Sequence, residues 1–185
     1  MNGGRRTARL RRQAGFTLIE LLVATTIGLL VMSALTSVVV LTMIGTNAAT
    51  GRVETSGQIR NFELFAYDDF ALSRPPAPSG CGTAANPCTT QPMVLSGFRM
   101  INQASGQAAS FTVTYSWSAA TQSVTRAIGP SSQIAAGDVT AFSWYVDAAG
   151  ARPVVVIAMT VTVGFYNTSY SQSQTLLFYP RITSP

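Results

Sequence analysis

A run of uncharged, mostly apolar residues near the N-terminus constrains the fold more than any other feature of the chain. It extends for 24 residues, from Leu21 to Ile44, and the next charged residue is Arg52. A helix of this length spans roughly 36 Å, which is enough to cross the hydrocarbon core of a bilayer. A removable signal peptide has a shorter apolar region followed by a cleavage site, and nothing after Ile44 ends this run cleanly. The run therefore predicts a retained membrane-spanning helix, with an ordinary signal peptide as the alternative.

The net charge of the chain belongs to the segment that precedes this run. Five of the twelve arginines lie in the first twelve residues, and the chain beyond Gly15 has seven arginines and seven acidic residues. Positive residues beside a membrane span are retained in the cytoplasm. We therefore expect a cytoplasmic N-terminus and a C-terminal domain outside the cytoplasm. Nucleic-acid binding by the basic tail is the alternative.

The composition excludes several kinds of chemistry. Histidine and lysine are absent, so the usual general base and the commonest metal ligand are missing. A hydrolase would depend on a Ser–Asp pair or on paired carboxylates, and no motif of either kind occurs. We expect no catalytic residues, no metal and no cofactor.

Glu20 is an acidic residue at the edge of the apolar run. It lies in the segment Gly15-Phe16-Thr17-Leu18-Ile19-Glu20-Leu21-Leu22-Val23. A carboxylate at the centre of a bilayer costs about 2.5–3.5 kcal/mol and less towards the interface, so a functional one needs a partner. The alternative is that Glu20 lies among the lipid headgroups and stabilises the start of the helix.

The basic leader and this segment closely resemble the class III leader and first helix of type IV pilins and type II secretion pseudopilins. The resemblance implies that a prepilin peptidase cleaves after Gly15 and N-methylates Phe16. It also implies that the apolar helix remains as membrane anchor and filament core, and that Glu20 pairs with the N-terminal amine of a neighbouring subunit. Other implied partners are minor and major pilins or pseudopilins, the inner-membrane assembly platform, and membrane lipid before assembly. The implied location is the inner membrane, crossed once, with a periplasmic domain, and later a pilus or pseudopilus.

Two features bear on the kind of subunit. Proline is absent between Phe16 and Pro75, so glycines are the expected weak points of the helix, at Gly28, Gly45, Gly51 and Gly57. Glu20 is present, whereas the tip pseudopilin of the secretion system usually lacks this carboxylate. The tip position is therefore disfavoured.

The helical pattern continues beyond the apolar run. Apolar residues recur at three- and four-residue spacings from Val53 to Leu72, which predicts an amphipathic helix as far as about Ser73. The sequence Arg74-Pro75-Pro76 then ends the helix. We expect its apolar stripe to pack on a sheet, because the heptads are too few and irregular for a coiled coil.

Residues 75–92 are rich in Pro, Gly, Ser and Thr and predict a loop. Cys81 and Cys88 lie in this loop, and outside the cytoplasm such a pair predicts a disulfide worth roughly 2–3 kcal/mol. A redox or metal-binding pair is the alternative. CxxC spacing and histidine are both absent, which disfavours it.

From Val94 onward the apolar pattern has a period of two, which predicts strands. Residues 111–117 and 122–128 form a predicted hairpin, followed by strands at 139–146, 155–165 and 174–179. On the 155–165 strand, one face carries Val155, Ile157, Met159, Val161, Val163 and Phe165. We predict an α+β, pilin-like fold in which the long helix covers one face of an antiparallel sheet of four to six strands. Ser and Thr on the other face explain how only 10% charged residues keep the domain soluble.

These observations predict five segments along the chain. They are a basic leader at 1–15, a transmembrane and filament-core helix at 16–45, an amphipathic continuation at 46–74, a disulfide loop at 75–92 and a sheet domain at 93–185.

The order of landmarks in the sheet region is similar to that of W-type minor pilins and of the minor pseudopilin J. The landmarks are Tyr115, Arg126, Gly137-Asp138-Val139, Tyr145-Val146-Asp147, Gly150 and Pro153-Val154-Val155-Val156. The resemblance implies a non-catalytic minor subunit that is incorporated into, or initiates, a type IV pilus. A minor pseudopilin of a type II secretion system is the alternative.

An adhesin or DNA-uptake module shares the same anchor and is a further alternative. It would need an exposed basic or aromatic patch, and Arg74, Arg99, Arg126, Arg152 and Arg181 are dispersed along the sequence. We therefore expect no nucleic-acid partner. The acidic residues Asp68, Asp69, Asp138 and Asp147 are too scattered to predict a calcium site.

Overall fold

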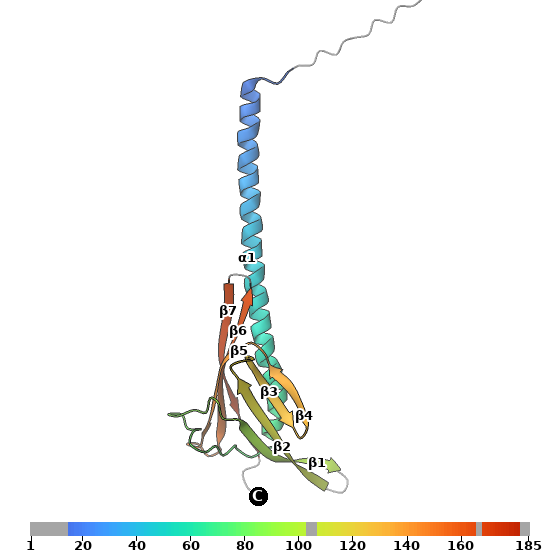
Figure 1. Ribbon diagram of the computed structural model, residues 1–185, viewed down its shortest axis with the longest axis vertical. Helices are drawn as coiled ribbons and strands as arrows, with labels where there is room; N and C mark the ends of the chain where they lie inside the picture. Colours follow the sequence, from blue (N-terminus) through green and yellow to red (C-terminus); the bar gives the residue numbers. More distant parts are fainter. Residues whose placement is uncertain (1–14, 103–106, 166–167, 182–185) are drawn as a thin grey trace, which may run out of the picture. The chain divides into compact units, whose positions relative to one another are not determined.

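The computed structural model describes residues 15–102, 107–165 and 168–181, and the basic leader, residues 1–14, lies outside them (Figure 1). The chain divides into two compact units, Met1–Gly45 and Thr46–Pro185. The first unit contains the beginning of one long helix. The second contains the rest of this helix and all of the strands.

Helix α1 extends without interruption from Leu18 to Ala71, over 54 residues. Residues 15–46 are exposed throughout, and by length and composition α1 is able to cross a bilayer. The hydroxyl groups of Thr25, Thr26 and Ser33 donate to carbonyl oxygens three residues earlier, and Thr36 and Ser37 bond four residues back. These polar side chains are therefore satisfied within the helix, as a hydrocarbon environment requires.

The helix ends two residues before the predicted end at Ser73, because the chain begins to pair with a strand there. Ser73 forms an isolated antiparallel bridge with Gly97. The Arg74 N–H donates to the Ser96 carbonyl over 2.9 Å, and the Phe98 N–H donates to the Leu72 carbonyl over 3.3 Å.

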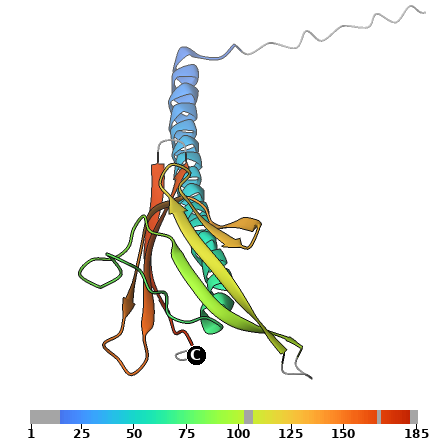
Figure 2. The ribbon, with the colours of Figure 1, turned by 60° about the horizontal axis from the view of Figure 1, so that its bottom comes forward.

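The strands form two antiparallel sheets (Figure 2). Sheet 1 has the order β1-β2-β3-β4, and sheet 2 has the order β5-β6-β7. The strands of sheet 1 are β1 (Met93–Asn102), β2 (Gln107–Ser118), β3 (Ser123–Ile128) and β4 (Ser131–Ala136). Those of sheet 2 are β5 (Val139–Asp147), β6 (Val154–Phe165) and β7 (Thr168–Phe178).

The α+β class and the antiparallel pairing are confirmed, but the prediction of one sheet with four to six strands is wrong. Among the described residues there are seven strands in two sheets. The chain leaves sheet 1 after β4 through a turn in which Asp138 has a left-handed φ of 55°. It then starts β5 in sheet 2. The predicted hairpin is present as β2 and β3, with Tyr115 opposite Arg126.

The core lies between α1 and the two sheets. From α1 it takes a buried stripe that includes Ile59, Phe62, Ala66 and Phe70. The predicted inward face of β6 is confirmed from Val155 to Val163, and the side chain of Phe165 lies outside the described part. The predicted apolar stripe of the helix is therefore buried against strands, but against two sheets instead of one.

The outer face of sheet 2 carries small hydroxyl side chains that bond to one another across the strands. Thr140 and Thr162 are 3.1 Å apart at their hydroxyl oxygens, Thr160 and Ser173 2.9 Å, and Thr162 and Ser171 3.0 Å. These hydroxyl pairs make their part of the face polar without charge, as the Ser and Thr residues of the sequence predict.

Replacing Gly97 by Ala is expected to destabilise the domain. A Cβ at Gly97 overlaps the carbonyl oxygen of Leu72, where the chain leaves α1, whereas one at Gly164 meets nothing within 4 Å. We expect Gly97→Ala to lower the free energy of unfolding by about 1–3 kcal/mol. The control Gly164→Ala is expected to change it by less than about 1 kcal/mol. Urea unfolding of the full chain in detergent, followed by tryptophan fluorescence, measures both; equal stability of the two variants would contradict the prediction.

Candidate functional site

The segment that precedes α1 is exposed and non-helical. Gly15, Phe16 and Thr17 have no regular secondary structure, and the helix begins at Leu18. The Thr17 carbonyl accepts the N–H groups of Glu20 and Leu21, and its Oγ1 accepts the Glu20 N–H over 3.3 Å. Thr17 therefore caps the helix, and the peptide bond between Gly15 and Phe16 lies just outside it.

Glu20 lies in the first turn of α1 with its side chain exposed. The spacing Thr17-x-x-Glu20 is that of a capping box, in which the glutamate helps to satisfy the helix start. The threonine half of this motif is formed. Among the described residues, the Glu20 carboxylate makes no ion pair.

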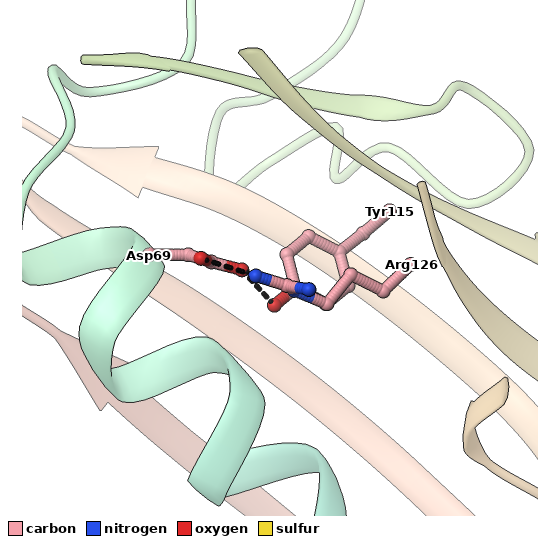
Figure 3. A network of polar contacts seen from close by, with 3 residues as sticks. All are labelled: Asp69, Tyr115 and Arg126. Atoms are coloured by element: carbon pink, nitrogen blue, oxygen red, sulfur yellow. Dashed lines mark hydrogen bonds and ion pairs between the residues drawn. The ribbon is translucent and has the colours of Figure 1, made fainter. Parts of the chain in front are cut away.

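The last turn of α1 carries a buried ionic network (Figure 3). Asp69 has a side chain only 1% exposed, and it receives Arg126 Nε at 2.6 Å on Oδ2 and Arg126 Nη2 at 2.7 Å on Oδ1. The Tyr115 hydroxyl donates to the same Oδ2 over 2.7 Å. The network ties α1 to strands β2 and β3.

The surroundings of this network shift the pKa values of two of its members. Burial, followed by the hydrogen bond to Asp69, raises the pKa of the Tyr115 phenol far above its usual value. The hydrogen bond to Asp69 raises the pKa of the Arg126 guanidinium. Tyr115 therefore stays neutral and Arg126 charged over the physiological range, which suits a structural contact rather than proton transfer.

The sequence patterns described above do not predict this network, although the position of Asp69 along the helix indicates it. Asp69 follows Phe62 by seven residues and Ala66 by three, so it falls on the buried stripe of the helix. Its neighbour Asp68 is exposed. An acidic residue on an apolar helical stripe predicts a buried partner, and here the partner comes from 57 residues away.

The structure joins Cys81 and Cys88 by a disulfide, with 5.1 Å between their Cα atoms. Cys88 exchanges two backbone hydrogen bonds with Trp144 of β5, at 2.8 and 2.9 Å. The disulfide therefore belongs to a loop that packs along the edge of sheet 2.

The acidic residues considered for calcium do not come together. Asp147 accepts the N–H of Ala149 over 3.0 Å, as expected of an aspartate in a turn. Asp69 is engaged by Arg126, and Asp138 lies in the turn before β5. In the described part of the chain, no three acidic or cysteine side chains are grouped as metal ligands.

A groove of about 470 Å³ lies between α1 and β7. Its helical wall carries Arg60, Glu63, Leu64, Tyr67 and Asp68, and its other wall is Leu176–Phe178. On the helical wall, Leu64 and Tyr67 are 67% and 63% exposed, so this wall is apolar and open. Leu177 alternates with the buried Leu176 and Phe178, so its side chain lies on the other face of β7.

A family model described as the prokaryotic N-terminal methylation motif matches residues 10–36. The chain carries a prepilin-type leader. The matched region contains Gly15, Phe16, Glu20 and the first part of the apolar run, and it supports a type IV pilin-like or pseudopilin protein. The comparisons with curated proteins and with solved structures return no match.

The raised pKa of Tyr115 predicts that the domain loses stability at alkaline pH. Above about pH 10 the unfolded phenol ionises while the folded one does not, so the free energy of unfolding falls as pH rises. Tyr115→Phe loses a buried hydrogen bond worth about 1–2 kcal/mol at neutral pH, but it also loses this dependence.

Urea unfolding between pH 7 and pH 11 tests this expectation. The variant is expected to be less stable at pH 7 and to show a flatter profile above pH 10. Tyr67→Phe, at an exposed tyrosine of α1, is the matched control and is expected to keep the wild-type profile. Parallel alkaline profiles of wild type and Tyr115→Phe would contradict the assignment.

Proposed function

We propose that the protein is a minor pilin-like structural subunit that is incorporated into, or initiates, a type IV pilus. The observation that supports this most directly is the methylation motif, which lies on a long exposed apolar helix. The same helix continues into a domain with a disulfide, as expected outside the cytoplasm. The five segments inferred from the sequence, from the leader at 1–15 to the sheet domain at 93–185, are part of this proposal.

In this proposal, maturation changes the charge at the start of α1. Prepilin peptidase cleaves after Gly15 on the cytoplasmic side and N-methylates the new amine of Phe16. The amine is a positive charge beside the positive end of the helix dipole, an unfavourable position without a nearby carboxylate. Glu20 of an adjacent subunit supplies that carboxylate, and two charges that are costly alone in an apolar bundle become tolerable as a pair. The pair fixes how neighbouring subunits align.

The surface of α1 supports the same proposal. A helix that is apolar around its whole circumference is stable only in lipid or among other apolar helices. Residues 15–46 are exposed, so this part of α1 needs such surroundings. We infer that lipid surrounds it in the inner membrane, and that other pilin or pseudopilin helices surround it after the assembly platform inserts the subunit.

A nucleic-acid-binding module is disfavoured by the positions of the arginines. Arg126 is occupied by Asp69, and Arg74 and Arg99 lie over separate rings, Phe98 and Phe111, each at 5.9 Å. A minor pseudopilin of a type II secretion system has the same leader and anchor and remains the second candidate. Its assembly steps would be the same.

The N-terminal sequence and intact mass of the protein from its host's membranes test the processing step. We expect a chain that starts at Phe16 and carries one additional methyl group on its amine. The disulfide lowers the mass by two hydrogens, and reduction restores them. A chain that starts near residue 45 or beyond would show signal cleavage and would overturn the filament proposal.

Substitution of Glu20 tests the assembly step separately. Glu20→Ala is expected to be cleaved and methylated like the wild type, because the bond after Gly15 is unchanged. We expect at least a roughly tenfold drop in co-purification with partner subunits, as for loss of one partner of a buried charge pair. Glu54→Ala, at an exposed glutamate later in α1, is the control. Normal co-purification of Glu20→Ala would remove Glu20 from the mechanism.

A further inference from the structure

Two sheet edges are covered by neighbouring chain or by helix side chains. The segment Leu72–Arg74 pairs with the edge of β1 through two backbone hydrogen bonds. At β4, the Asn61 amide donates to the Ala135 carbonyl over 2.9 Å, and the N–H of Gly137, just after the strand, donates to Gln58 Oε1 over 2.8 Å.

The edge of β5 is covered by the disulfide loop. Cys88 exchanges two backbone hydrogen bonds with Trp144, and the Val146 N–H donates to the Gly82 carbonyl over 3.0 Å. Among the described residues, other parts of the chain therefore bond to backbone groups at or beside three of the four sheet edges, which limits unwanted strand pairing there.

The edge of β7 is different. Its backbone pairs with β6, and within the described residues no other backbone hydrogen bond reaches it. The strand has eleven residues with no charge and no proline, and its eleven pairs with β6 show no register shift. It lacks the charges, prolines and bulges that usually protect an open edge.

The groove between α1 and β7 lies beside this open edge. A second hollow of about 170 Å³ shares Tyr67, Leu177 and Phe178 with it and extends to Tyr179 and Arg181. Unpaired backbone groups next to exposed apolar side chains are the features by which a sheet edge accepts an extended peptide.

The charges of the groove indicate what kind of peptide fits. Arg60, Glu63 and Asp68 lie on its helical wall, and none of them makes an ion pair among the described residues. Arg181 lines the adjoining hollow, so the acidic character is local to Glu63 and Asp68. A segment with a basic side chain between apolar ones complements these two carboxylates.

We propose that the edge of β7 accepts an extended segment of a neighbouring subunit of a different sequence as an additional strand. The apolar side chains of that segment contact Leu64 and Tyr67, and its basic side chain lies near Glu63 and Asp68. The proposal rests on the proposed function only in naming a subunit as the partner.

Three synthetic peptides test this proposal on the full chain in detergent micelles. The peptide TLTKTLT presents Leu, Lys and Leu on one face and Thr on the other, TLTETLT reverses its charge, and TLPKPLT lacks N–H groups needed for strand pairing. Amide hydrogen exchange of residues 168–178 and a binding titration are the readouts. We expect TLTKTLT to slow exchange in β7 and to bind about threefold more tightly than TLTETLT. We expect TLPKPLT to give no protection.

Variants then locate the peptide. Glu63→Gln combined with Asp68→Asn is expected to remove the preference for the basic peptide, and Leu64→Ala to weaken binding several-fold. Val53→Ala, at an exposed apolar residue of α1 outside the groove, is the matched control and is expected to bind normally.

Several results would overturn the proposal. They are no protection of β7, equal protection by TLPKPLT, or binding that Leu64→Ala leaves unchanged. Protection of β7 that rises with protein concentration without peptide would show that a second copy pairs there instead. The measurement does not depend on leader processing or on Glu20, so its failure is distinguishable from failure of the pilin-like function.

Discussion

The ring of Phe62 is the point at which helix and both sheets meet. It is fully buried and lies edge-on to Tyr115 of sheet 1 and to Phe142 and Phe178 of sheet 2, with centroids 5.5, 6.0 and 6.3 Å apart. Within the described residues, no strand ladder joins the two sheets. Their common core therefore depends on α1, and the helix that carries the methylation motif also organises the domain. Such aromatic contacts contribute beyond the area they bury.

The last turns of α1 fix the helix to each sheet by a different interaction. Asp69 is bound by Arg126 and Tyr115 of sheet 1, and Phe70 stacks on Phe178 of sheet 2 with centroids 4.5 Å apart. Burial of an ion pair is costly, so its contribution lies in specifying one arrangement more than in adding stability. The neighbouring residues Tyr67 and Asp68 line the groove beside β7 from the same turn of the helix.

The sequence predicts the parts of this fold that depend on local pattern. The apolar run, the amphipathic continuation of α1, the β2–β3 hairpin and the inward face of β6 all follow from periodicity. Strand β4 does not, because its buried residues Ala135 and Ala136 are adjacent and small, and a register shift opposite them breaks the alternation. The first half of β7 is polar and was not predicted as strand.

Contacts between distant segments are the other part that the sequence does not provide. The division into two sheets depends on where the chain turns at Asp138, and one left-handed residue leaves no periodic signal. The burial of Asp69 is recognisable from its position on the helical stripe, but the sequence does not indicate that its partner is Arg126. For the leader the situation is reversed, because the methylation motif at 10–36 is local and Gly15, Phe16 and Glu20 lie within it.

An open strand edge can pair with unrelated chains and cause aggregation, and anchoring in a membrane limits which chains reach it. Strand β7 has no charged side chain that would repel an incoming strand. A domain tethered to a bilayer by α1, as we propose, meets only partners on the same side of that bilayer. Their effective concentration is high while that of other chains is low. In the proposed arrangement, the membrane anchor limits which proteins reach the edge of β7. Glu63 and Asp68 then favour those partners whose segment carries a basic side chain.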